Sequence, residues 1–228
     1  RYENEAAEIF ELESSDRAFE EEVMLSGFGT APVKSEGSAI NFDNAQETYT
    51  ARYTMETIAL AFSITEEAVE DNLYDRLAAR YTRALARSMA QTKQIKGATV
   101  LNNAFLATSP IGDGAALCSA AHPSLSGNQT NLLATPADLN ETSLEEILIQ
   151  IAGFTDERGL KIAVRGTKLM IPKELQFIAE RIINSNLRPG SADNDINAMK
   201  SMGMLPEGAA VNHFFTDADA YFVKTDCP

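Results

Sequence analysis

The chain has 228 residues, of which 44% are apolar, and 33 acids stand against 19 Lys and Arg, so its net charge is −14. This composition excludes a disordered or fibrous chain, and the acid excess argues against a protein that binds nucleic acid by neutralising many phosphates. The longest apolar run, residues 58–62, is far shorter than the roughly 20 residues of a membrane-spanning helix. Two cysteines, Cys118 and Cys227, do not make a disulfide framework, so a reducing compartment is expected.

Residues 1–22 form an acidic segment that holds half of the net charge, −7 of −14. Its apolar side chains are too few to build a core of their own. This charge pattern is typical of an extended arm or a weak amphipathic helix that something else orders. A solvated first helix fits the same pattern equally well.

Apolar and polar residues alternate with a period of two between residues 38 and 64. The alternation runs through residues 40–42 and again through residues 49–55. The polar stretch between them is Asp43-Asn44-Ala45-Gln46-Glu47. The pattern predicts a long β-hairpin over 38–64 with its turn at 43–47. Only one face of this hairpin can be buried, and nothing nearby in the sequence covers that face.

A long helix is predicted to begin at Thr65, because Glu66 and Glu67 follow it and no proline occurs before Pro110. Acids crowd its first turns and only bases follow, an order that complements the helix dipole. A continuous helix of about 40 residues would be a rod of about 60 Å, long for a compact domain of this size. Gly97 is expected to kink or interrupt this helix near its end.

Four arginines share one face of the predicted helix, beside its apolar stripe, because their spacing is four, three and four residues. They are Arg76, Arg80, Arg83 and Arg87. Two roles fit this stripe: contact with a DNA backbone, or pairing with acids of the same chain or of a neighbour. The large number of acids favours the second role.

The second half of the chain predicts an α+β unit over residues 142–225. Residues 108–140 read as a long loop, which in a compact domain is usually functional or an interaction segment. A helix is expected from Thr142 or Ser143 with Glu145 and Glu146 in capping-box positions, then a strand over 162–171 and a helix from Pro172. Short strands are expected over 209–215 and 220–224. The stretch 193–197 has several oxygen ligands but lacks the glycine and glutamate of a calcium loop, so it reads as a polar turn.

Cys118 and His122 are the candidate catalytic residues, because a cysteine and a histidine can act as nucleophile and base. Such a pair also needs an orienting group and an oxyanion site, which the sequence does not indicate. With two His and two Cys in the whole chain, the spacing matches no zinc pattern. Phosphate-binding, nucleophile-elbow and zinc-protease motifs are missing as well. A turn-forming His-Pro loop is therefore favoured over catalysis, and neither a metal nor a cofactor is expected.

Several stretches, taken in order, resemble the major capsid proteins of tailed bacteriophages, closest to the Mu-like major head subunit group. The resemblance covers residues 38–225. It rests on the order in which these stretches occur, because no single stretch is specific to the family. These pieces are Leu60–Glu67, Leu101–Phe105, Asp113–Ser119, His122-Pro123, Asn131-Leu132, Thr142–Glu145, Leu169–Pro172, Asn194–Asn197 and Thr216–Phe222.

The resemblance implies an α+β capsid-shell fold of the tailed-phage and herpesvirus type. Its parts would be an acidic N-terminal arm (1–37), an extended hairpin loop (38–64), a peripheral domain with a spine helix and the following loop (65–141), and a mostly axial domain (142–225). Residues 226–228 are expected to be a truncated tail, since chains of this family usually continue with another strand.

The implied function is structural rather than enzymatic: a subunit that assembles with itself into pentamers and hexamers of an icosahedral head around double-stranded DNA. The expected location is the virion, after assembly in the bacterial host cytoplasm, with no membrane contact or sequence-specific DNA binding. Portal, scaffold or decoration proteins are further expected partners. We expect subunit contacts at the hairpin residues Asp43, Asn44, Gln46 and Glu47 and at the four arginines. Two alternatives stay open: an encapsulin-like compartment shell, and an intracellular hydrolase that uses Cys118 and His122.

Overall fold

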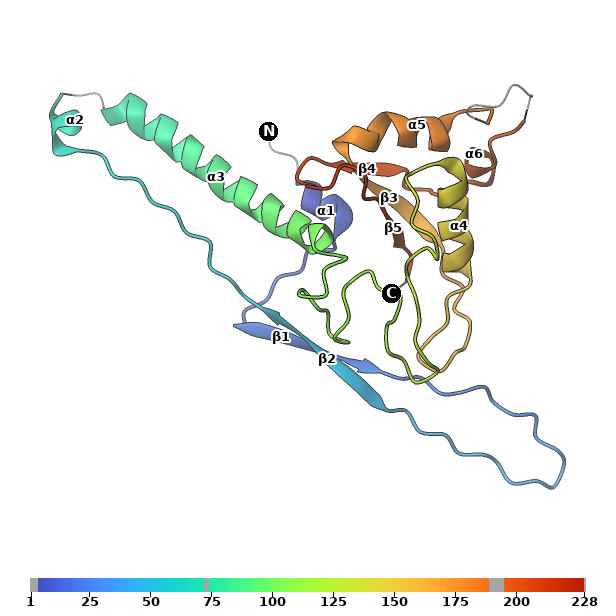
Figure 1. Ribbon diagram of the computed structural model, residues 1–228. Helices are drawn as coiled ribbons and strands as arrows, with labels where there is room; N and C mark the ends of the chain where they lie inside the picture. Colours follow the sequence, from blue (N-terminus) through green and yellow to red (C-terminus); the bar gives the residue numbers. More distant parts are fainter. Residues whose placement is uncertain (1–3, 72–73, 189–194, 228) are drawn as a thin grey trace.

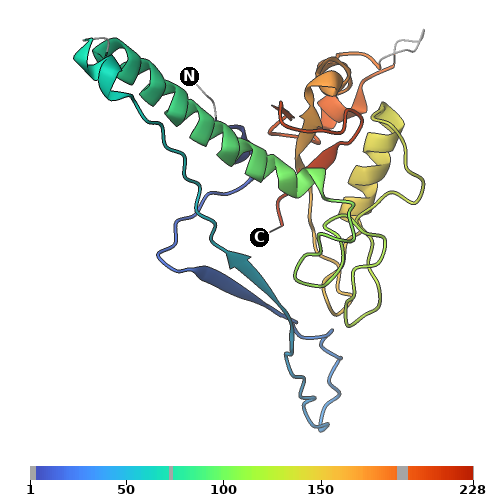
Figure 2. The ribbon, with the colours of Figure 1, turned by 60° about the vertical axis from the view of Figure 1, so that its left-hand side comes forward.

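Three parts make up residues 4–71, 74–188 and 195–227, which the computed structural model describes: a layered α/β body, a long helix that leaves it, and a two-stranded hairpin (Figure 1). The helix and the hairpin both extend well beyond the body (Figure 2). Among the described helices, none is both long and apolar enough to cross a membrane.

The body is built on a three-stranded mixed sheet with the order β4-β3-β5. The central strand β3 (Gly166–Pro172) runs parallel to β4 (Ala209–Asn212) and antiparallel to β5 (Phe222–Thr225). Strand β4 lies within the predicted range 209–215, and β5 overlaps the predicted range 220–224 but ends one residue beyond it. The strand expected over 162–171 begins later, at Gly166, and ends at Pro172. Pro172 is also the N-cap of the helical turn that starts at Lys173, so the predicted helix begins one residue later than expected.

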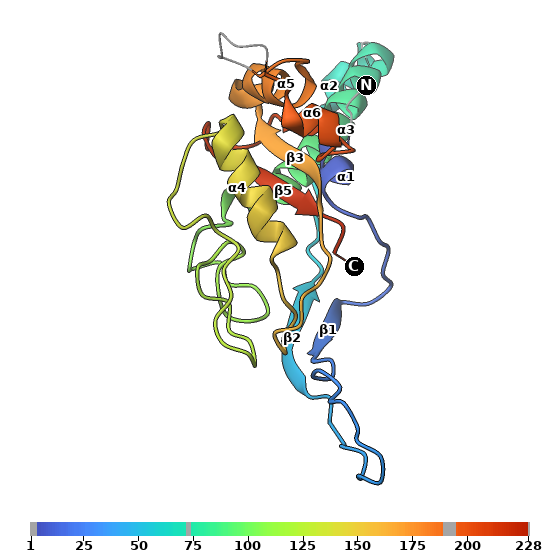
Figure 3. The same ribbon diagram turned by 90° about the vertical axis from the view of Figure 1, so that its right-hand side faces the viewer.

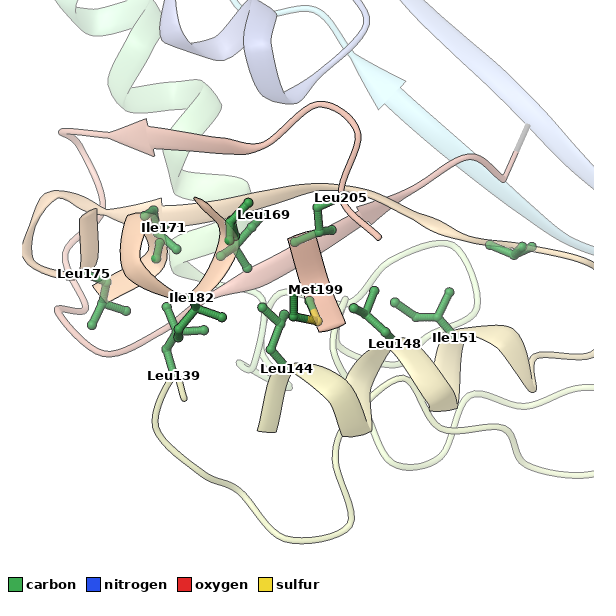
Figure 4. Close-up of a cluster of buried hydrophobic side chains, with 13 residues drawn as sticks. Leu139, Leu144, Leu148, Ile151, Leu169, Ile171, Leu175, Ile182, Met199 and Leu205 are labelled. Carbon is green, nitrogen blue, oxygen red and sulfur yellow. The ribbon is translucent and has the colours of Figure 1, made fainter. Parts of the chain in front are cut away.

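The larger apolar core lies on one face of β3, where helices α4 (Glu141–Ala152) and α5 (Gln176–Asn184) pack against it (Figure 4). Leu144 of α4 and Leu169 and Ile171 of β3 are fully buried in this cluster. Fully burying one such side chain contributes about 1.5–3 kcal/mol, so this cluster is the main source of the body's stability. The short helices η1 (Lys173–Leu175) and α6 (Ala198–Met202) complete the layer.

The start of α4 is fixed by a capping box that the sequence analysis placed two or three residues too late. The side chain of Asn140 accepts a hydrogen bond from the Ser143 amide at 2.9 Å, and Ser143 Oγ accepts one from the Asn140 amide at 3.0 Å. Glu145 and Glu146 therefore do not take part in the capping box, which is formed by Asn140 and Ser143. Asn140 is a strong N-cap residue, and its short amide reaches the third helical amide directly.

The second apolar cluster lies on the other face of β3 and orders the N-terminal arm. Helix α1 (Glu5–Ile9) buries Ile9 against Leu101 and Met170. Gln94 Oε1 accepts a hydrogen bond from the Ala6 amide at 3.0 Å and so ties the arm to the long helix. The arm is therefore ordered by the body of its own chain. The part of the calcium-like stretch at residues 193 and 194 lies outside the described residues.

The helix start predicted at Thr65 is confirmed, since Thr65 is the N-cap of α2 (Glu66–Glu70). The single helix of about 40 residues is wrong, because α2 ends at Glu70 and the long helix is α3 (Tyr74–Asn102). Residues 72 and 73 lie outside the described chain. The 29 residues of α3 span about 43 Å. Gly97 does not interrupt the helix, so that expectation is wrong. A Cβ on Gly97 would lie 3.0 Å from the Ala6 Cβ, so glycine there lets the arm approach the helix closely.

The hairpin pairs strands β1 (Phe19–Leu25) and β2 (Glu47–Thr54), which are antiparallel. The prediction that residues 40–42 pair with 49–55 across a turn at 43–47 is wrong, because the partner strand lies in the segment interpreted as the arm. Residues 26–46 form the long connection instead. Seven residues of β1 include three glutamates in a row and are almost all exposed, so burial imposes no alternation that the sequence could reveal.

A pair of neighbouring residues on α4 tests where the stability of the body resides. Leu148 is 5% exposed in the main core, whereas Ile149 is 73% exposed on the same helix. We expect Leu148→Ala to lower the free energy of unfolding by about 2–5 kcal/mol, because it leaves a cavity in the core. Ile149→Ala should change it by no more than about 0.5 kcal/mol. Urea denaturation measures both, and equal losses would contradict this placement of the core.

Candidate assembly surfaces

The hairpin connection, residues 26–46, presents large apolar side chains to solvent. Val33 is 99% exposed and Phe42 is 95% exposed, and Phe28 and Ile40 are more than half exposed. This connection extends beyond the body in both views (Figures 1 and 2). A run of exposed apolar side chains on a projecting segment marks an interaction site rather than ordinary surface.

Two of the four predicted hairpin contact residues are held within the chain. Asp43 Oδ2 accepts a hydrogen bond from the Gly29 amide at 2.7 Å, and Arg158 Nη2 donates one to the Asn44 carbonyl at 2.5 Å. The Gly29 amide, then the Asn44 amide and the Arg158 charge, lower the pKa of Asp43. The pKa of Asp43 is lower in the folded chain than its usual value of about 3.9. The contacts of the ionised carboxylate therefore stabilise the fold fully at neutral pH, and this stabilisation is lost only in acid.

The other two predicted contact residues, Gln46 and Glu47, are exposed at the end of the paired strands. Ser26 closes this end: its amide donates to the Gln46 carbonyl at 2.8 Å, and its Oγ accepts from the Gln46 amide at 2.9 Å. The side chains of Gln46 and Glu47 therefore face solvent on a fixed backbone. Arg158, by contrast, was not anticipated as a hairpin partner, because it lies 114 residues from Asn44.

The hairpin meets the body through two loops, one before α4 and one after it, which descend beside the strands (Figure 3). A Cβ on Gly112 would lie 2.9 Å from the Ala51 Cβ and 3.1 Å from Tyr49 Cδ2, so glycine permits this contact. Burial, followed by the charges of Asp113 and Glu157, raises the pKa of Tyr49. We call this contact the hairpin junction; it comprises Tyr49, Ala51, Gly112, Asp113, His122, Glu157 and Arg158.

His122 belongs to the hairpin junction and is paired with Asp113, not with Cys118. His122 Nδ1 lies 2.6 Å from Asp113 Oδ2, and the Asp113 side chain is only 4% exposed. Cys118 lines a separate cavity of about 520 Å³, and burial raises the pKa of its thiol to about 11. A thiol with this pKa is a poor nucleophile at neutral pH, so the hydrolase alternative gains no support from this geometry. Within the described residues, no three His, Cys, Asp or Glu side chains gather so that they could hold a metal ion.

The outer half of α3 is poorly covered by the rest of the described chain. Tyr81 is 47% exposed and has one aromatic contact, with Phe62 at 5.7 Å between ring centroids. Arg80 and Arg83 are exposed and form no ion pair with any described residue. Arg87 has an interaction partner, and the side chain of Arg76 lies outside the described part.

A projecting apolar hairpin and a long helix with an uncovered half define a class of protein that completes its buried surface with other molecules. Residues 48–226 match the family described as phage capsid protein, and the chain belongs to this family. It is therefore a structural protein of the phage head, located in the virion. No curated protein sequence matches the chain.

A solved structure supports the same fold. The capsid of bacteriophage JBD30 decorated with minor capsid protein trimers superposes with a TM-score of 0.62 over 89% of this chain and 87% of that chain. The two sequences are 12% identical over this match, so the likeness is one of fold. The predicted α+β capsid architecture is thus confirmed at the level of the overall fold.

The two cysteines give a direct test of whether Cys118 is reactive. We expect iodoacetamide at pH 8 to label the exposed Cys227 about a hundredfold faster than Cys118, because a thiol with a pKa of about 11 is almost entirely protonated there. Peptide mass spectrometry over a time course separates the two rates. Faster labelling of Cys118 than of Cys227 would show an activated thiol and reopen the catalytic interpretation.

Proposed function

We propose that the chain is the repeating subunit of an icosahedral phage head, within the Mu-like major head subunit group, and that it forms pentamers and hexamers around double-stranded DNA. The observation that carries the proposal is the exposed apolar connection of the hairpin, above all Val33 and Phe42. Side chains of this size exposed to this extent are stabilised only when another surface covers them. A second copy of the same chain is the partner that a capsid protein has in greatest supply.

Charge supports the outer half of α3 as the surface that receives the hairpin. Residues 19–54 contain six acids and two bases, whereas residues 76–96 contain six bases and no acid. A hairpin placed on the helix of the next subunit is a head-to-tail contact, and such contacts close into rings. The proposed contact residues are Asp43, Asn44, Gln46, Glu47, Arg76, Arg80, Arg83 and Arg87.

The rest of the proposal concerns the other partners and the parts of the subunit. Residues 65–141 would form the peripheral domain with its spine helix, and residues 142–225 most of the axial domain. The net charge of −14 would keep the shell from binding its packaged DNA tightly. The minor capsid protein trimers on the JBD30 capsid support a decoration partner here too. We propose portal and scaffold contacts and assembly in the host cytoplasm on the same basis.

The apolar hairpin residues can be tested by a double substitution, Val33→Ser with Phe42→Ser. We expect loss of pentamers, hexamers and shells with an unchanged unfolding transition, because neither side chain packs in the subunit. Light scattering and negative-stain microscopy measure assembly, and Ile149→Ser, which removes an exposed apolar side chain of the body, is the matched control. Normal shells from the double variant would contradict the proposal, as would particles that enclose protein cargo in place of DNA.

The charge complementarity can be tested by reversal and rescue. Arg80→Glu with Arg83→Glu should abolish assembly, because it places like charges on the two surfaces. Adding Glu36→Lys and Glu47→Lys on the hairpin should restore part of it. Lys173→Glu on η1 with Arg181→Glu on α5 reverses the same charge elsewhere and serves as the control. The proposal would be contradicted if the hairpin substitutions did not restore assembly and the control variant lost assembly completely. That result would show that net charge alone controls assembly.

A further inference from the structure

The cavity that Cys118 lines lies between α4, β5 and the loop of residues 131–137, and its volume is about 520 Å³. Close-packed protein interiors leave few voids larger than one water molecule, whereas sites for small organic ligands measure about 300–1,000 Å³. The cavity therefore has the size of a ligand site rather than that of a packing defect.

Aromatic and aliphatic side chains make up most of the wall of this cavity. Phe222 of β5 stacks on Phe105, with 5.7 Å between the ring centroids and an interplanar angle of 23°. Phe105 is 50% exposed, and Ile147, Tyr221 and Phe222 are partly buried. An aromatic ligand would remove this apolar surface from water and would stack on the same rings.

Two polar side chains of the wall already use their donors within the chain. Gln150 Nε2 donates a hydrogen bond to the Leu132 carbonyl at 3.0 Å, and the Tyr221 hydroxyl donates one to the Ala137 carbonyl at 3.2 Å. A ligand needs no polar group to satisfy these donors. Apolar contact therefore dominates its recognition.

Charge narrows the class of ligand further. Among the described residues that line the cavity, Asp219 is the only one with a charged side chain at neutral pH, and none is basic. Burial raises the pKa of Cys118 to about 11, so its thiol is neutral. An anion would meet a negative charge and no positive one. Asp219 is itself exposed, so it offers a cation little to offset the loss of hydration.

We propose that this cavity is a binding site for an uncharged aromatic molecule of one or two fused rings, held between α4 and β5. Its wall contains Ile151 and Val223 from the main core and Phe222 from the second cluster, so a bound ring connects the two apolar layers. A ligand that binds only the folded chain stabilises it. The site consists of residues of one chain, so it does not depend on the proposed function.

The site can be tested by isothermal titration calorimetry of the purified chain with 2-naphthol. We expect a dissociation constant of about 100 µM at pH 7, typical of a ligand of this size. 2-Naphthalenesulfonate has the same rings with an anionic group and should bind at least about tenfold more weakly, because its charge has no partner in the cavity. Ile147→Trp and Leu132→Trp fill the cavity from two walls and should each weaken 2-naphthol binding at least about tenfold. Ile149→Trp, at a 73% exposed position of α4, is the matched control and should leave binding unchanged.

Alkylation of Cys118 gives a second readout that needs no substitution. 2-Naphthol at ten times its dissociation constant should slow iodoacetamide labelling of Cys118 about tenfold, while the exposed Cys227 keeps its rate. The site would be overturned by an absence of binding, by unchanged affinity in both cavity-filling variants, or by equally tight binding of the sulfonate. Binding by the free subunit that disappears in assembled shells would also overturn it, because a neighbouring copy would then fill the cavity in place of a small molecule.

Discussion

The structure depends on one strand whose two faces are both buried. In β3, Leu169 and Ile171 face the core made with α4 and α5, while Met170 faces the cluster made with Ile9 and Leu101. Successive side chains of a strand point to opposite faces, so a strand this apolar needs a covering layer on each side. One layer comes from helices that follow one another in the sequence. The other comes from the arm and the inner end of α3, which brings residues more than 60 positions away onto the sheet.

This constraint separates the molecule into a stable end and an incomplete end. The inner end of α3 is fixed by Leu101 in the second cluster, whereas its outer half and the hairpin lie beyond both cores. The outer half of α3 and the hairpin are exposed because they lie too far from β3 to pack against either of its faces. Their apolar and charged side chains suit contact with further copies of the chain. The hairpin junction connects the two ends through the contacts of Arg158 with Asp43 and Asn44 and of Gly112 with β2.

Sequence reasoning succeeded where a pattern was local and failed where contacts joined distant segments. The long helix was predicted from the order of its charges, acids first and bases after them, because this order complements the helix dipole. Strand β3 was predicted from its apolar run. Strand β1 was missed because an exposed strand shows no alternation. Arg158 and Gly112 were missed as junction residues because no short-range signal links them to β2. Cys118 and His122 are close in sequence yet line different cavities, so their spacing alone suggested a pair that the fold does not form.

The central claim is that the hairpin connection and the outer half of α3 are covered by neighbouring copies in the assembled head. Hydrogen–deuterium exchange compares the free subunit with purified shells most directly. The account predicts strong protection of residues 27–43 and 78–87 on assembly, because these backbone segments become buried. The core around β3 should change little, since it is complete in the subunit. Shells in which these two segments exchange as fast as in the free subunit would contradict the claim.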